Sequence, residues 1–230
     1  MINIMWRGYL SRSALKAHER WARRGQQGAG RLVLEGGDLR DAYVPHPHLV
    51  AARFVRCDLT GANFRIGNLS QIELRECIWN GGLLEMAKFN KAIIENCQFV
   101  GAYLNVANFV GTQIRGGEWR QVDLHNTMWD EAVVEDVCFQ NARFEGSVIK
   151  NARFVGCDFR GANLAEVEYD NTLFLECDLR ETNMDTAKLK NSRLRRCKTP
   201  RSSAIAMPTF RIPGPPQPTL HPMPHPAPIQ

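Results

Sequence analysis

Residues 57–64 read Cys57-Asp58-Leu59-Thr60-Gly61-Ala62-Asn63-Phe64, and the pattern of this stretch continues in both directions along the chain. Stepping by five residues from Leu39, every position is apolar as far as Leu194, and 12 of these positions are Leu and 10 are Phe. The residue two positions before each of them is small, most often Ala or Cys, except at Pro47 and Ile72. A fixed period of this kind predicts a repeat protein.

The five-residue spacing also predicts the local structure of each unit. In an extended segment, positions two apart point to the same side, so the apolar residue and the small residue both face inward. The other three positions are mostly Asp, Asn, Glu, Arg, Gly and Gln, which suit an outward face or a corner. A helix is excluded, because a five-residue step drifts around a helix of 3.6 residues per turn.

The cysteines indicate how many units close one turn of the coil. Six of the seven occupy the small inward position and are separated by multiples of 20 residues: Cys57, Cys77, Cys97, Cys157, Cys177 and Cys197. Four five-residue units per turn predict a four-sided solenoid of about eight turns, stacked roughly 4.8 Å apart. In such a column a cysteine is a small buried hydrophobe, and we expect free thiols. Cys138 falls at an outward position instead.

The units Cys57-Asp58-Leu59-Thr60-Gly61 and Cys157-Asp158-Phe159-Arg160-Gly161 resemble the consensus A-[DN]-L-x-x of the bacterial pentapeptide-repeat family. The resemblance covers about residues 37–198, and the register never slips. It implies an all-β fold, a right-handed quadrilateral β-helix, in agreement with the turn count drawn from the cysteines. Residues 15–21 are similar to the short capping helix that precedes many such solenoids.

Three regions follow from these patterns. Residues 1–30 form an apolar segment and a basic capping helix, residues 31–198 form the β-helix, and residues 199–230, with ten of the chain's 12 prolines, form a disordered tail. The helix is predicted over residues 11–24, with Ser11 or Ser13 as the N-cap and Gly25 as the stop. One face of it carries Leu10, Ala14, His18 and Trp21.

Composition and charge narrow the classes of function. The net charge of +5 resides at the two ends of the chain, whereas residues 121–190 are strongly acidic, and this distribution argues against direct nucleic-acid binding. No apolar run is long enough to cross a bilayer, and the first residues do not resemble a secretory signal. We therefore expect a cytoplasmic protein that does not bind membranes.

The sequence also predicts that the protein is not an enzyme. No nucleophile–base set, glycine-rich phosphate loop or paired-carboxylate constellation is identifiable from spacing. His46 and His48 lack the companions of a metal site, so we expect no metal and no cofactor. A prism filled by its own side chains leaves little room for a substrate pocket.

The class of function that these patterns favour is binding through the outer surface. The leading hypothesis is an interaction module whose flat sides bind a protein partner. The candidate binding residues are the outward apolar residues Leu83 and Tyr103, one turn apart on the same side, and Ile78, one unit before Leu83. A homodimer is a further option.

Two alternatives stay open. Some members of the family resemble B-form DNA and protect DNA gyrase, a type II topoisomerase, through an acidic face. The acidic candidates here are Asp130, Glu131, Glu135 and Asp136, although arginines interrupt the acidic pattern and the C-terminus is proline-rich. The second alternative is an effector or targeting module that is secreted without a cleaved signal.

Overall fold

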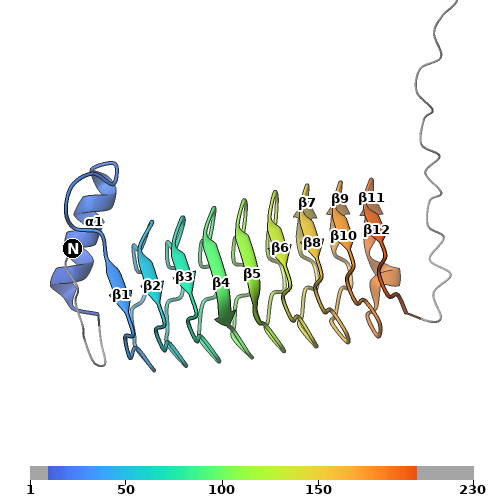
Figure 1. The fold of residues 1–230 in the computed structure, drawn as a ribbon, viewed down its shortest axis with the longest axis horizontal. Coiled ribbons are helices and arrows are strands. Elements are labelled where there is room, and N and C mark those ends of the chain that lie inside the picture. Colours follow the sequence, from blue (N-terminus) through green and yellow to red (C-terminus); the bar gives the residue numbers. More distant parts are fainter. Residues whose placement is uncertain (1–9, 201–230) are drawn as a thin grey trace, which may run out of the picture.

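The computed structural model describes residues 10–200. The predictions made for residues 1–9 and for the proline-rich tail beyond residue 200 lie outside the described residues. Between these limits the chain forms one α-helix followed by a long coil of short parallel strands (Figure 1).

The largest sheet runs along one side of the coil. Its nine strands are all parallel, and consecutive members lie 20 residues apart, so that Phe54 pairs with Leu34 on one edge and with Leu74 on the other. We call this side 1. Its strands, in spatial order, are β1 (Val33–Glu35), β2 (Arg53–Val55), β3 (Glu73–Arg75), β4 (Ile93–Gln98), β5 (Gln113–Glu118), β6 (Val133–Glu135), β8 (Arg153–Val155), β10 (Leu173–Leu175) and β12 (Arg193–Arg195).

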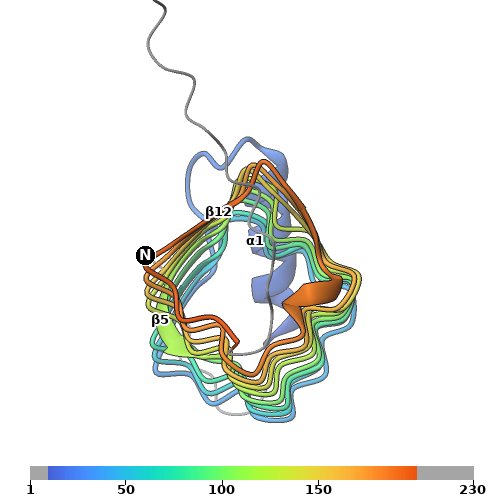
Figure 2. The same ribbon diagram turned by 90° about the vertical axis from the view of Figure 1, so that its right-hand side faces the viewer.

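Three more sides complete each turn. Side 2 carries Asp58, side 3 carries Asn63 and side 4 carries Asn68, each with its equivalents at 20-residue intervals. Most turns are joined there by isolated parallel bridges, and side 4 ends in a parallel sheet of β7 (Val148–Lys150), β9 (Glu168–Asp170) and β11 (Lys188–Lys190). A single 3-10 turn, η1 (Met184–Thr186), interrupts the last coil. Viewed along its axis, the coil has a four-sided outline (Figure 2), which confirms the predicted quadrilateral β-helix of about eight turns.

The inward positions fill the solenoid with stacked side chains. Phe89, Phe109 and Trp129 lie on successive turns of side 4, with ring centroids 5.2 Å and 4.2 Å apart. All three are fully buried, as are nearly all the inward residues of the middle turns. A core of this kind is close-packed through the middle turns. Specificity for a partner must therefore come from the outer surface.

One irregularity of the cysteine column has a backbone cause. Gly117 occupies a cysteine position of side 2, with φ +108°. A side chain at this position would collide with the carbonyl oxygen of Cys97 on the preceding turn. Only glycine fits such a conformation and such a close approach. Here β4 and β5 continue their pairing around the corner, from Ile93–Gln113 to Gln98–Glu118.

The helix α1 (Arg12–Arg23) covers the N-terminal end of the coil (Figure 1). The hydroxyl of Ser11 accepts the N–H of Ala14 at 3.1 Å, so Ser11 is the N-cap. Ala14, His18 and Trp21 are buried, in agreement with the predicted apolar face. His18 Nδ1 accepts the Leu32 N–H at 3.0 Å, which ties the helix to the first turn. The cap therefore covers core residues that an open end would expose.

Candidate protein-binding surface

Every corner of the coil uses the left-handed backbone conformation. The corner residue stands two positions after the inward apolar residue, and φ is positive at nearly every such residue. Gly, Asn and Asp occupy many corners, since they adopt this conformation at low cost. Large apolar corner residues occur only in one column of the described coil, on three successive turns. They are Ile66, Met86 and Val106, with φ values of 56°, 60° and 61°. We call these three residues the apolar ridge.

The ridge is costly for the fold. Left-handed backbone costs an L-residue about 1–2 kcal/mol, and β-branched side chains such as Ile66 and Val106 tolerate it least. Burial does not offset this cost, because Ile66, Met86 and Val106 are 47%, 52% and 47% exposed. The coil requires this conformation at nearly every corner but does not require these residue types, so large exposed apolar residues at the corners point to a function.

Side 3 adds two apolar residues next to the ridge. Leu83 and Tyr103 lie side by side on successive turns, joined by a parallel bridge. Tyr103 is 48% exposed and Leu83 is half-buried. Leu83 and Tyr103 lie on the side that leads into the ridge corner. We call these two residues and the ridge together the apolar patch.

Ile78, the third predicted binding residue, lies elsewhere. It is half-buried on side 2, bridged to Asp58 and Gln98, and is separated from Leu83 by the corner at Gly81. The structure therefore places Leu83 and Tyr103 side by side and Ile78 on a different side of the coil. The ridge was not predicted from the sequence, because the predicted binding residues are outward positions in the middle of a side and the ridge residues are corner positions. The available signal was a large apolar residue at the corner position on three successive turns.

Charged residues flank the patch without covering it. On side 3, Arg65 holds the carboxylate of Glu85 through two hydrogen bonds of 2.7 Å and 2.8 Å. On side 4, Lys88 is exposed and has no ion pair within residues 10–200. The residues beside the patch therefore include one neutralised ion pair, Arg65–Glu85, and one cation, Lys88, that is available to a partner.

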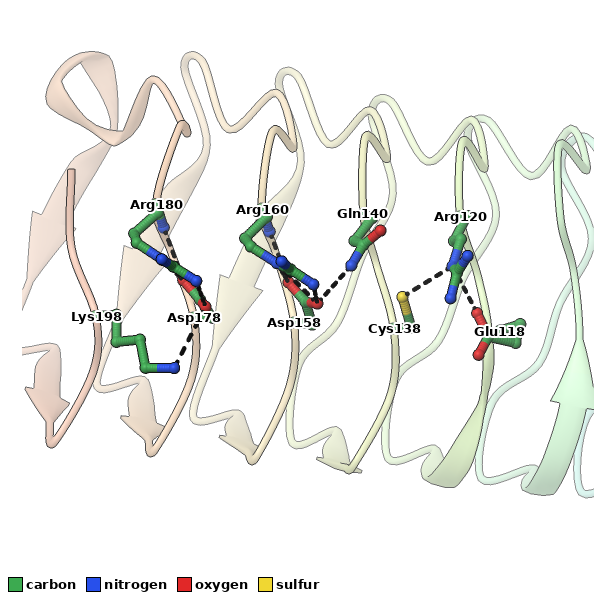
Figure 3. Close-up of polar contacts among 9 residues, drawn as sticks. All are labelled: Glu118, Arg120, Cys138, Gln140, Asp158, Arg160, Asp178, Arg180 and Lys198. Atoms are coloured by element: carbon green, nitrogen blue, oxygen red, sulfur yellow. Dashed lines mark hydrogen bonds and ion pairs between the residues drawn. The ribbon is translucent and has the colours of Figure 1, made fainter.

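On side 2 the acidic residues are neutralised by arginines of the same turn (Figure 3). The Asp178 carboxylate accepts a hydrogen bond of 2.6 Å from Arg180, and the Asp158 carboxylate accepts one of 2.6 Å from Arg160. Burial alone would raise the pKa of Asp158, but the hydrogen bonds from Arg160 and Gln140 outweigh it and lower the pKa to about 2. These carboxylates stay ionised at neutral pH, yet the side as a whole presents alternating charges.

The four acidic candidates lie on one turn but not on one side. Asp130 lies on side 4 and Glu131 at the corner that follows, whereas Glu135 lies on side 1 and Asp136 at the next corner. Arg115 binds the carboxylate of Glu135 at 2.8 Å. The geometry gives these residues no common flat acidic face, which is the feature that DNA mimicry requires.

The cysteine column lies inside side 2. Cys57, Cys77, Cys97, Cys157 and Cys177 are buried, Cys197 on the last turn is half-buried, and all of these thiols are free. Contact with Cys157 and burial raise the pKa of the Cys177 thiol to about 12, so it stays protonated and unreactive. The half-buried Cys138 faces outward on side 2, and its sulfur accepts a hydrogen bond of 3.3 Å from Arg120 Nε (Figure 3).

Two features of the described residues bear on the binding of small molecules and metals: a hollow on side 1 and the placement of the His, Cys, Asp and Glu side chains. Side 1 has a shallow hollow of about 230 Å³, lined by Ile93, Gln113, Val133 and the Arg115–Glu135 pair. Its volume is below that of ordinary ligand pockets, and it contains no nucleophile or histidine. Within residues 10–200 no three His, Cys, Asp or Glu side chains are placed to hold a metal ion.

Over the same residues, no helix is both long and apolar enough to cross a membrane.

The fold resembles several solved structures. The protein HetL from the cyanobacterium Nostoc sp. strain PCC 7120, a pentapeptide repeat protein involved in heterocyst differentiation regulation, shares 18% identity over 74% of this chain and 84% of its own, with a TM-score of 0.36. QnrB1, a plasmid-mediated fluoroquinolone resistance protein, shares 16% identity over 84% of this chain and 91% of its own, with a TM-score of 0.47. A pentapeptide repeat protein of the Arabidopsis thaliana thylakoid lumen shares 28% identity over 39% of this chain and 63% of its own, with a TM-score of 0.38.

No curated protein sequence matches the chain. Family descriptions do match it. "Pentapeptide repeat region" covers residues 72–149, and "Pentapeptide repeats (8 copies)" covers residues 157–196, together just over half of the sequence. With the 20-residue turn and the unbroken five-residue register, these matches identify the chain as a member of the pentapeptide repeat family.

Proposed function

We propose that this protein is a non-enzymatic interaction module that binds a protein partner through the apolar patch. The observation that carries the proposal is the apolar ridge, where Ile66, Met86 and Val106 hold a strained backbone and still expose about half of their side chains. Exposed apolar surface with a polar rim is typical of protein interfaces. A solenoid of regular, hydrogen-bonded turns presents such a surface with little loss of backbone freedom on binding.

The charges of the surface support a protein partner over nucleic acid. Phosphate binding requires unpaired cations, yet Arg160 and Arg180 on side 2 and Arg115 on side 1 are each bound to a carboxylate. An acidic DNA-mimicking face is not favoured either, since the same pairs neutralise it. The apolar patch departs from this balanced pattern.

Site-specific photo-cross-linking in cells of the source organism tests the proposal. A benzophenone amino acid replaces Tyr103 in the patch, and the matched control carries it at Val133, which is 37% exposed on side 1. We expect a discrete protein adduct from position 103 that Met86→Glu abolishes, and no such adduct from position 133. Equal adducts from both positions, or an adduct from position 103 that Met86→Glu leaves unchanged, would contradict the proposal. Mass spectrometry of the adduct shows whether the partner is a type II topoisomerase, another protein or a second copy of this chain.

A further inference from the structure

We propose that the apolar ridge binds the ridge of a second copy of this chain, in a parallel dimer whose two-fold axis runs along the solenoid. The inference rests on the proposed function, because it takes the apolar patch as a binding surface and names its occupant. Three features of the ridge support this occupant: its spacing, its symmetry and the charges beside it.

The spacing of the ridge is that of the coil itself. Ile66, Met86 and Val106 stand on successive turns, so neighbouring ridge residues repeat at the strand spacing of about 4.8 Å. A second solenoid laid parallel has the same repeat and meets all three residues at once. An α-helix repeats every 5.4 Å and turns its side chains away from a straight line. A coil of the same rise per turn, such as a second copy of this chain, therefore matches the spacing of the ridge.

The symmetry of a dimer then fixes which residues meet. A two-fold axis parallel to the solenoid places each ridge residue against its own counterpart, as in any isologous interface. Ile66 meets Ile66 of the second copy, Met86 meets Met86, and Val106 meets Val106. Side 3 of each copy comes to lie beside side 4 of the other.

The charges beside the ridge favour this parallel arrangement. Glu85 directly precedes Met86 on side 3, and the exposed Lys88 follows two residues later on side 4. In the parallel dimer Glu85 of each copy, already bound to Arg65 of its own chain, faces Lys88 of the other copy. One carboxylate can hold two cations, as Asp178 does with Arg180 and Lys198. In an antiparallel dimer centred on Met86, side 4 would face side 4, and the two exposed Lys88 ammonium groups would oppose each other.

The interface is small. The corner column continues with Asn126, Gly146 and Glu166, so the apolar contact is confined to the N-terminal half of the coil. A stable dimer buries about 800 Å² per partner, and a patch of five side chains covers less than that. We therefore expect a reversible dimer that forms with rising protein concentration.

Sedimentation velocity on the full chain over a range of concentrations tests the dimer. The disrupting variant is Met86→Glu, which the fold tolerates because Glu76, Glu131 and Glu176 hold the same left-handed corner conformation. The control is Val133→Glu on side 1, where the neighbouring Arg153 can pair with the new carboxylate. We expect the control to dimerise like the wild type and Met86→Glu to weaken dimerisation at least tenfold. A wild type that stays monomeric throughout, or a Met86→Glu variant that dimerises normally, would overturn the inference.

Cross-linking distinguishes the orientation. In a Cys138→Ser background, Ile66→Cys should react with itself through a short bismaleimide in the parallel dimer. An antiparallel dimer would yield a product only when Ile66→Cys and Val106→Cys chains are mixed, and that result overturns the parallel arrangement, as does the absence of any product. Failure here leaves the proposed function separately testable, because a foreign protein can still be trapped from position 103 and lost in Met86→Glu.

Discussion

Ile66 and Val106 hold a backbone conformation that asparagine holds at six other corners of the coil, at Asn96, Asn126, Asn141, Asn151, Asn171 and Asn191. Asparagine adopts this conformation with less strain than a β-branched residue. We therefore expect Ile66→Asn and Val106→Asn each to raise the free energy of unfolding by on the order of 1 kcal/mol. Equilibrium denaturation in urea measures this change. Destabilisation by either variant would show that the ridge serves the fold and not a partner.

Two buried tryptophans differ in their hydrogen bonding. Trp129 Nε1 donates to Thr127 Oγ1 at 2.8 Å, whereas the buried Trp119 Nε1 has no partner among residues 10–200. Phenylalanine fills the equivalent place on the turns next to Trp119, at Phe99 and Phe139, so the core accommodates it there. An unsatisfied buried donor costs about 1–3 kcal/mol, and Trp119→Phe removes that cost.

We therefore expect Trp119→Phe to destabilise the protein by about 1–2 kcal/mol less than Trp129→Phe, which loses a satisfied hydrogen bond. Urea denaturation of the two variants side by side provides the comparison. Equal losses of stability would mean that the volume of the ring alone decides its contribution.

At the residue level, the sequence predicted the inward positions better than the corners. The two-residue alternation assigns Cys57 and Leu59 to the core directly, because strand geometry leaves only two faces. The conformation of Ile66 could not be predicted in this way, since a left-handed β-branched residue contradicts its own intrinsic preference. The 20-residue period indicates that Ile66, Met86 and Val106 form one column, whereas their left-handed conformation and their exposure are seen only in the structure.

At the level of single elements, α1 contains a pH-sensitive contact. His18 is fully buried, and its ring stacks on Trp21 with centroids 5.3 Å apart. Burial, together with the nearby charges of His48 and Arg31, lowers the pKa of His18 from 6.5 to about 4. The unfolded cap therefore binds a proton at a higher pH than the folded cap does. The stability that His18 contributes is complete above pH 6.5 and is lost as the pH falls toward 4.

We expect the cap to loosen by up to roughly 3 kcal/mol between these pH values. Amide hydrogen exchange of residues 12–32, corrected for its intrinsic pH dependence, should show faster opening at pH 4.5 than at pH 7. The His18→Gln variant keeps an acceptor for the Leu32 N–H and should lose this pH dependence. Protection that is independent of pH in the wild type would contradict the assignment.

The helix itself could be predicted from the sequence, whereas its main contacts could not. Serine before an apolar face indicates an N-cap, and the hydrogen bond from the Ala14 N–H to Ser11 confirms this. Nothing in the sequence indicates that His18 accepts the N–H of Leu32, because the two residues are brought together only when the helix packs over the first turn. The start of a helix can be predicted from its local sequence, whereas the contacts between the helix and the coil depend on the tertiary fold.

At the level of the whole molecule, the described surface combines paired charges with an exposed apolar ridge. Arginine–carboxylate pairs such as Arg160–Asp158 repeat along side 2, and similar pairs occur on side 1. These pairs keep the sheet-rich surface polar and leave it without a face of a single charge sign. The apolar patch stands out against this background, on the corner between sides 3 and 4.

The most direct test of this account is to measure stability and association together in the double variant Ile66→Asn/Val106→Asn. If the ridge is kept for binding, the variant unfolds at a higher urea concentration than the wild type and loses both self-association and the cross-linked adduct from position 103. If the ridge is incidental, the variant gains stability while association and the adduct persist unchanged. That second result would contradict the assignment of the apolar patch as the binding surface.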